Sequence, residues 1–147
     1  MSGGSLVFRN CALTNLTINP GYWAKPNRLR AEHCTVRNTD RPFLRFPVYS
    51  IDTILLKQST FDTGDNAVVQ IYDLREQDTD PLPARLVLEE CTVQGTAPAM
   101  VAVPSRQREV RKQLTLRGIK NVLPETMSLI LSEDVRDSWK LELSQIP

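Results

Sequence analysis

AEHCTVRN, at residues 31–38, returns as LEECTVQG at residues 88–95, with Cys-Thr-Val at the same place in both stretches. Self-similarity of this kind is the signature of repeat architectures, so it decides the fold. The apolar segments that extend the match begin at Leu6, Leu29, Ile54, Leu86, Leu114 and Leu141. These starts are 23, 25, 32, 28 and 27 residues apart (29−6, 54−29, 86−54, 114−86 and 141−114). The chain is therefore predicted to be built of imperfect repeats of about 27 residues.

A phase slip recurs inside each repeat. Strict alternation would turn the fifth residue of every segment inward, yet mostly polar residues stand there, and the inward phase resumes one residue later. A slip at the same place in every repeat predicts a tight corner between two short strands, where Asn and Gly tolerate a left-handed backbone. The expected corner residues are Asn10, His33, Gln58, Glu90 and Gly118, and the inward residues after them are Cys11, Cys34, Ser59, Cys91 and Ile119.

Another apolar strand is expected later in each repeat, at residues 16–18, 43–46, 67–71, 100–103 and 128–131. The strands are rich in β-branched residues, Pro, Gly, Asp and Asn stand in the links, and no segment shows a helical period of useful length. Short strands that recur in this way predict an all-β fold, a parallel β-solenoid of about five to six coils.

The repeat resembles the right-handed parallel β-helix of the pectin-lyase-like superfamily, which includes pectate lyases, polygalacturonases, phage tailspikes and many adhesins. The matching features are the repeat length, the short corner carrying Asn10 or Gly118, and the stacked pairs NC, HC, QS and EC that straddle the corner. The resemblance extends from Leu6 to Leu143. It implies the fold and leaves the function open, because unrelated activities share such a fold.

Composition and charge limit the classes of protein that fit. The chain has 147 residues, 41% of them hydrophobic, which suits one domain. Eighteen basic and seventeen acidic residues leave a formal charge of +1, so neither nucleic acid nor a membrane surface is predicted as a partner. No apolar run approaches the ~18 residues of a membrane span, and the start lacks the features of a signal peptide. Residues 1–5, MSGGS, are expected to be a remnant of expression, and residues 6–147 a single β-helix domain or a fragment of a larger protein.

The cysteines are expected to be structural. Cys11, Cys34 and Cys91, with Ser59, should form one inward column, because equivalent residues on neighbouring strands lie ~4.8 Å apart. A disulfide would be strained, since parallel Cβ atoms at that spacing exceed the usual ~3.5–4.5 Å. Buried, inert thiols are therefore favoured over metal, redox or nucleophilic roles, and neither a metal nor a cofactor is predicted. The outward column beside them is expected to hold Ala12, Thr35, Thr60, Thr92 and Lys120.

The superfamily resemblance makes polysaccharide cleavage an obvious hypothesis, because its enzymes usually place their cleft along one sheet. Here the corresponding strands are the later apolar strands of each repeat. Paired carboxylates ~5–9.5 Å apart, or a calcium cage, cannot be assembled from their outward residues, which carry a single charge. No catalytic residue is predicted on this face, and Arg45 and Gln70 are candidate ligand contacts. The expected outward set is Thr17, Arg45, Val68, Gln70, Met100, Ala102 and Ile130.

Four of these outward residues form an apolar strip across successive strands: Val68, Met100, Ala102 and Ile130. Contiguous exposed apolar surface usually marks association, so the strip is a candidate interface. The alternative is that a loop or a terminal segment of the same chain covers it. Association would produce a homo-oligomer, such as a trimer, or contact with neighbouring domains of a parent chain.

The links between strands hold the remaining candidates, since loops on a rigid scaffold often carry function. Tyr22 and Trp23 could stack on a sugar or contact a protein. Arg106 and Arg108, in the basic run 105–112, could meet phosphate or an acidic sugar, although ordinary surface charge explains them as well.

Carboxylates in the links supply an alternative, catalytic hypothesis. Asp62 and Asp65 flank Gly64, and Asp73 and Glu76 lie in the link at 72–84. Solvated turns explain all four more simply.

Two functions remain as hypotheses. The favoured one is a non-catalytic structural or receptor/glycan-binding β-helix segment, phage tailspike-like or surface-adhesin-like, located on a virion or cell surface. It is expected to self-associate, because a solenoid without capping elements leaves apolar side chains and unpaired backbone at each end. The alternative is a polysaccharide lyase or glycoside hydrolase domain that uses the link carboxylates.

Overall fold

The computed structural model describes residues 5–19, 28–47, 53–72, 84–102, 112–130 and 139–146. The regular elements in these ranges are strands, with no helix among them. They are β1 (Ser5–Arg9), β2 (Ala12–Thr14), β3 (Arg28–Glu32), β4 (Thr35–Arg37), β5 (Leu44–Pro47), β6 (Thr53–Lys57), β7 (Thr60–Asp62), β8 (Val69–Tyr72), β9 (Ala84–Glu89), β10 (Thr92–Gln94), β11 (Ala99–Ala102), β12 (Lys112–Ile119), β13 (Ser128–Ile130) and β14 (Trp139–Ile146).

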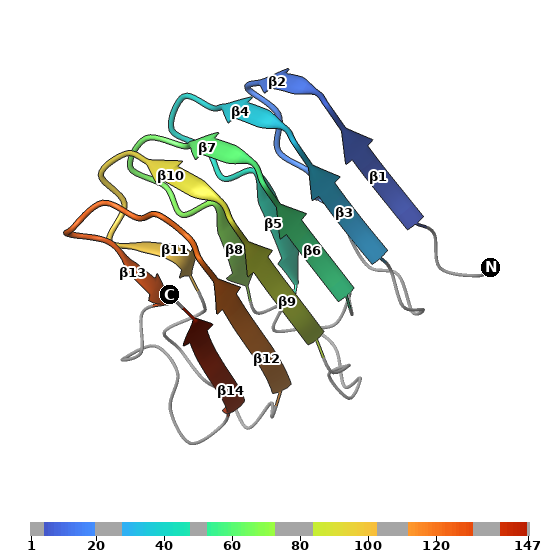
Figure 1. The fold of residues 1–147 in the computed structure, drawn as a ribbon, viewed down its shortest axis with the longest axis vertical. Coiled ribbons are helices and arrows are strands. Elements are labelled where there is room, and N and C mark those ends of the chain that lie inside the picture. The colour runs from blue at the N-terminus through green and yellow to red at the C-terminus, as the bar shows by residue number, and fades with distance from the viewer. Residues whose placement is uncertain are drawn as a thin grey trace.

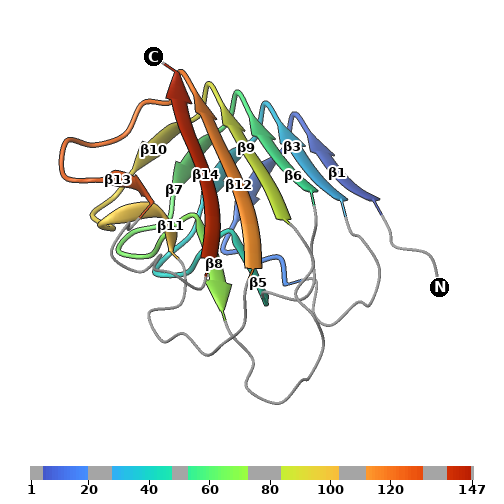
Figure 2. The same cartoon turned by 90° about the horizontal axis from the view of Figure 1, so that it is seen from below.

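The strands form three sheets in which all the pairings are parallel (Figure 1). The orders are β1-β3-β6-β9-β12-β14, β10-β7-β4-β2 and β13-β11-β8-β5. Neighbours in each sheet therefore come from successive repeats, and Figure 2 shows the six strands of the first sheet side by side with their arrows in one direction. The predicted all-β fold of parallel strands is confirmed, and this order is consistent with a solenoid. We call these the long sheet, the second sheet and the third sheet.

The register confirms the predicted alignment of the first four repeats and corrects the rest. Leu6, Leu29, Ile54 and Leu86 stand in one column of the long sheet. The next member is Leu116, because Leu114 pairs with Ala84. The prediction is thus two residues off from this point, and the last strand continues the column with Leu143. A shift of two keeps every side chain on the same face, so alternation alone cannot detect it.

The corner between the long and second sheets is where the phase slip predicts it. Its residues have positive φ angles between 47° and 54°, although only one of them is an Asn or a Gly. Gly118 is not among them: it lies inside β12 opposite Leu88, and Lys120 turns the corner in its place. The predicted outward position of Lys120 is therefore wrong, and Val122 stands beside Thr92 instead. The observed corner residues are Asn10, His33, Gln58, Glu90 and Lys120.

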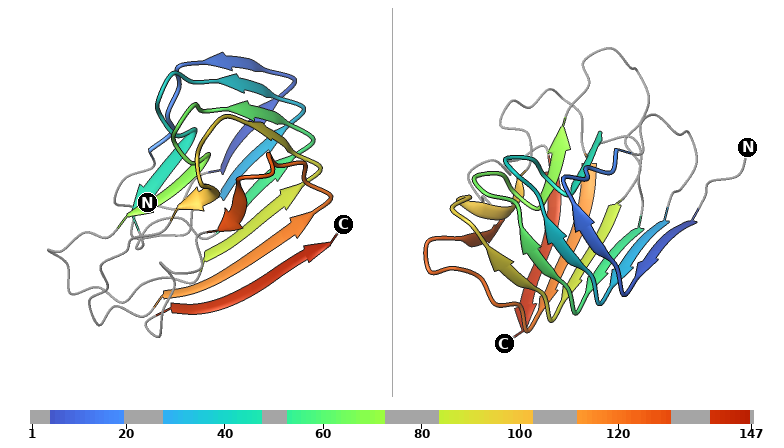
Figure 3. Two further views of the ribbon diagram at one scale, coloured as in Figure 1. Left: turned by 90° about the vertical axis from the view of Figure 1, so that its left-hand side faces the viewer. Right: turned by 90° about the horizontal axis from the view of Figure 1, so that it is seen from above.

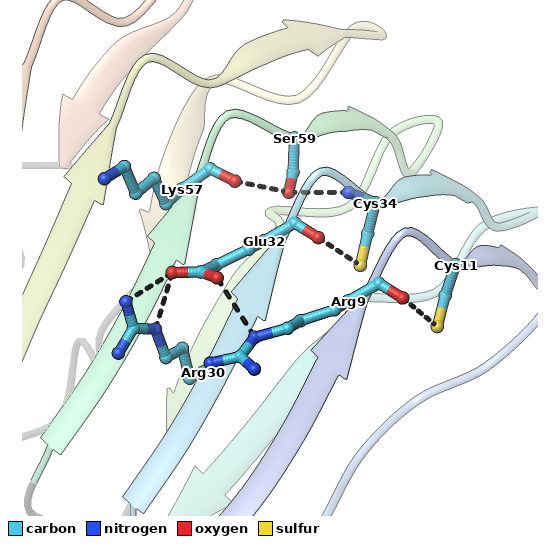
Figure 4. Close-up of polar contacts among 7 residues, drawn as sticks. All are labelled: Arg9, Cys11, Arg30, Glu32, Cys34, Lys57 and Ser59. Carbon is cyan, nitrogen blue, oxygen red and sulfur yellow. Dashed lines mark hydrogen bonds and ion pairs between the residues drawn. The ribbon is translucent and has the colours of Figure 1, made fainter.

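The inward column after the corner contains Cys and Ser repeatedly because these side chains hydrogen-bond to the backbone on the other side of the corner (Figure 4). The Ser59 hydroxyl donates to the Lys57 carbonyl at 2.8 Å, and the Cys34 thiol donates to the Glu32 carbonyl at 3.3 Å. The same bond, from residue i to the carbonyl of i−2, recurs at Cys11 and Cys91. Each of these side chains spans the left-handed residue between its ends, which stabilises a backbone conformation that non-glycine residues seldom adopt.

This column also satisfies backbone groups of the preceding repeat. The Cys34 N–H donates to Ser59 Oγ at 3.1 Å, and the Cys91 N–H donates to Asn121 Oδ1 at 3.0 Å. The Asn121 amide in turn donates to the Leu88 carbonyl at 2.8 Å. Asn121 therefore replaces the predicted Ile119 in the column, because the position requires a polar or sulfur-bearing side chain.

The core lies between the three sheets, which Figure 3 shows as separate walls. Leu56 and Leu88 from the long sheet, Phe61 from the second and Val69 from the third are fully buried. The first repeat is less covered than the second: Leu6 is 45% exposed, while its column neighbour Leu29 is 3% exposed. Equivalent residues therefore share one interior, and β1 lies at its margin.

Candidate functional surfaces

The outward side of the third sheet brings together two of the predicted contact residues. Arg45 pairs in register with Gln70, and Gln70 with Ala102. Arg45 is exposed, and Gln70 is half-buried. Thr17, on the segment preceding this sheet, donates its hydroxyl to the Pro42 carbonyl at 2.7 Å. Arg45 is the charged member of this face among the side chains that the structure describes, so a carboxylate pair is not assembled by them.

The predicted apolar strip on this face is not an exposed one. Val68 and Met100 are 1% and 0% exposed and belong to the core, and Ala102 is half-buried. Ile130 stands in register with Val101, a column predicted to face inward. The outward placement of Val68 and Met100 is therefore wrong.

A local irregularity explains the error at Val68. The backbone N–H groups of Phe43 and Leu44 both donate to the Val68 carbonyl at 3.0 Å, and β8 begins only at Val69. Two residues of one strand opposite a single residue of its neighbour form a β-bulge, where the alternation of inward and outward side chains is interrupted. Val68 and Met100 are therefore part of the core, and no covering loop or terminal segment is involved among the described residues.

The link carboxylates that the structure describes lie at a turn and are bonded there. Asp62 ends β7 and accepts a hydrogen bond from the Gly64 N–H at 3.3 Å. Asp65 is exposed and accepts one from the Thr96 hydroxyl. The first contact is typical of turn stabilisation by a short polar side chain, and the second joins two neighbouring repeats. The other predicted link residues, Tyr22, Trp23, Asp73, Glu76, Arg106 and Arg108, lie outside the described residues.

The thiols are free, as expected for a column of inert cysteines. Burial raises the pKa of the Cys91 thiol to about 11 and also raises the pKa of Cys34. Both thiols are therefore protonated at neutral pH, whereas a thiolate is the form that attacks or binds metal. Cys11, in the less covered first repeat, is only half-buried.

Sequence reasoning missed a charged surface on the outer side of the long sheet. Here Glu32 lies between two arginines, as Figure 4 shows. Arg30 Nε donates to Glu32 Oε1 at 2.6 Å, and Arg9 Nε lies 3.3 Å from Oε2. The hydrogen bond from Arg30, together with the charges of Arg30 and Arg9, lowers the pKa of the Glu32 carboxyl. The strand pattern contains the signal, because charged residues alternate with buried apolar residues in RLRAE, and Arg85 precedes a buried leucine in ARLVLE.

The described residues hold no group of three or more His, Cys, Asp or Glu side chains placed to bind a metal ion. None of the described segments is a helix long and apolar enough to cross a bilayer. Comparison with protein-family models, with curated proteins and with solved structures found no match.

Proposed function

We propose that this chain is a non-catalytic, glycan-binding segment of a right-handed parallel β-helix of the pectin-lyase-like type, with about five to six coils. It would act at a virion or cell surface, in the manner of a tailspike or an adhesin, and would associate with further copies or with neighbouring domains.

The observation that carries the proposal is the register of the third sheet's outward face. Arg45 and Gln70 stand on adjacent strands of a rigid sheet, about 4.8 Å apart along the stack. An arginine and an amide side by side can donate to the hydroxyl and carboxylate oxygens of a sugar chain. Cleavage would need two carboxyl groups facing one bond. The described carboxylates of the catalytic hypothesis, Asp62 and Asp65, are instead hydrogen-bonded to the Gly64 N–H and to the Thr96 hydroxyl.

The experiment combines a polysaccharide-binding panel with assays for reducing sugar and unsaturated uronate, and with light scattering. We expect binding without turnover, weakened by Arg45→Ala and Gln70→Ala but not by Arg37→Ala on the second sheet. A mass above that of one chain would support association.

Cleavage of a polysaccharide in these assays would favour the catalytic hypothesis over the non-catalytic one. If sugar is released, and if Asp65→Asn or Asp73→Asn abolishes the release, the chain is a carbohydrate-active enzyme that uses link carboxylates.

A further inference from the structure

The outer side of the long sheet is strongly basic. Its alternating burial points six basic side chains outward, with at least one on each of β1, β3, β6, β9 and β12. Against them stand two acidic side chains, Glu32 and Glu89, so the described face carries +4 (6 − 2). The whole chain carries +1, which leaves −3 (1 − 4) for all other residues. We call this surface the basic face, and its described cations are Arg9, Arg28, Arg30, Lys57, Arg85 and Arg117.

At least half of these cations are not neutralised by an ion pair with the residues that the structure describes. Arg9 and Arg30 share Glu32. Arg28, Arg85 and Arg117 are exposed and have no ion-pair partner among the residues that the structure describes. Exposed guanidinium groups held on a rigid sheet attract anions from solution and can bind carboxylate or sulfate groups through two parallel hydrogen bonds.

The spacing follows the direction in which the strands stack. Arg28 and Arg85 stand in one column with Thr53 between them, two strand spacings or about 10 Å apart. Arg117 lies one strand further on, two residues along from the partner of Arg85. From β1 to β12 the basic face spans four strand spacings, about 19 Å. A straight ligand with an anionic group at short, regular intervals could contact every strand.

Apolar side chains fill the gaps between the charges. The central outward column of the long sheet reads Val7, Arg30, Leu55, Val87, Arg117. Val7 is 49% exposed, and the other two aliphatic side chains are half-buried. Sugar rings present C–H surfaces between their polar substituents, so alternating aliphatic and guanidinium groups match a chain of acidic sugars.

Nucleic acid fits this surface less well. The described outward positions of the long sheet contain no aromatic side chain on which a base could stack.

We infer that the basic face binds a linear acidic polysaccharide that runs across the strands of the long sheet. This inference rests on the proposed glycan-binding function and names both the ligand class and a second surface for it. Carboxylate and sulfate groups share the chemistry that the arginines recognise, so the test includes one polymer of each kind.

The test measures binding of polygalacturonate, a sulfated glycan, neutral dextran and single-stranded DNA by calorimetry at low and moderate salt. The test variant is Arg85→Gln/Arg117→Gln, and the matched control is Arg37→Gln, an exposed arginine of the second sheet. Circular dichroism checks that each variant is folded. We expect an acidic glycan to bind, dextran not to bind the basic face, and each lost arginine to weaken binding about tenfold with a smaller salt dependence.

The remaining outcomes separate the two proposals. If the acidic glycan binds the double variant as it binds the original chain, while Arg45→Gln abolishes binding, the inference is wrong and the proposed function stands on the third sheet. Tighter binding of DNA than of either acidic glycan would overturn the inference by changing the ligand class. If no glycan binds at all, the inference and the proposed function both fail.

Discussion

Replacing Ser59 with alanine tests the account of the corner most severely. Ser59 is 2% exposed, and its hydroxyl both donates to the Lys57 carbonyl and accepts from the Cys34 N–H. The Lys57 carbonyl keeps a second partner, the His33 N–H at 3.1 Å. The Cys34 N–H has no other acceptor among the described residues, so the substitution leaves a buried donor unpaired.

The cost follows from that orphaned donor. A buried unpaired backbone group costs about 1–3 kcal/mol, and a lost hydrogen bond contributes about 0.5–1.5 kcal/mol. We therefore expect Ser59→Ala to lower the free energy of unfolding by about 2 kcal/mol. Ser59→Cys should lose less than about 1 kcal/mol, because Cys34 and Cys91 make the same bond to the i−2 carbonyl and also accept a backbone hydrogen bond from the column residue of the preceding repeat. The exposed Thr35→Ala should change stability by less than about 0.5 kcal/mol.

Urea denaturation followed by circular dichroism measures these differences, with an unchanged slope showing that the unfolded states are comparable. The reasoning is refuted if Ser59→Ala is as stable as the original chain, or if Ser59→Cys loses as much as Ser59→Ala. Either result would mean that the hydroxyl is not what satisfies the corner.

Three further predictions concern the turns and the thiols. Gly95→Ala should lower the free energy of unfolding by more than about 2 kcal/mol, because φ is 120° and a Cβ would lie 2.5 Å from the Gly64 carbonyl oxygen; the exposed Gln94→Ala is the control, and a stable Gly95→Ala would contradict the turn geometry. Because the pKa of Cys91 is raised from 9.0 to about 11, its contribution to stability is complete below pH 9 and is lost as the pH rises toward 11; urea midpoints at pH 8 and 10.5 should fall more for the original chain than for Cys91→Ala, and equal falls would argue against burial. A thiol reagent should label Cys11 in the folded protein, whereas Cys91 should react only after unfolding; prompt labelling of Cys91 would contradict its place in the core.

The repeat could be predicted from the sequence at positions where the structure accepts only a narrow set of residue types. The column of Cys34, Ser59 and Cys91 has to point inward and also bond to the backbone, so its composition is narrow and its echo is visible. The sequence could not decide whether Leu114 or Leu116 belongs to the column, because residues two positions apart in a strand point to the same face. The corner at Lys120 could not be predicted for another reason. Lysine seldom adopts a left-handed backbone, and the fold imposes that conformation on it there.

The candidate surfaces were harder to predict than the fold. Alternation placed Val68 and Met100 outside, but a bulge and packing within the chain bury them. The arginines of the basic face were visible as residues, yet their meaning depends on knowing that five strands lie side by side. Only the stacking order converts charges that are 23 to 32 residues apart into neighbours.

The central claim is that equivalent residues of successive repeats lie on neighbouring parallel strands. Scalar couplings through hydrogen bonds, measured by NMR, test it directly, because each coupling identifies the carbonyl that accepts a given N–H. The account predicts couplings from the Thr35 N–H to the Cys11 carbonyl, from Thr60 to Cys34, and from Thr92 to Ser59. Couplings that join these threonines to their own repeat, or that follow an antiparallel pattern, would contradict it.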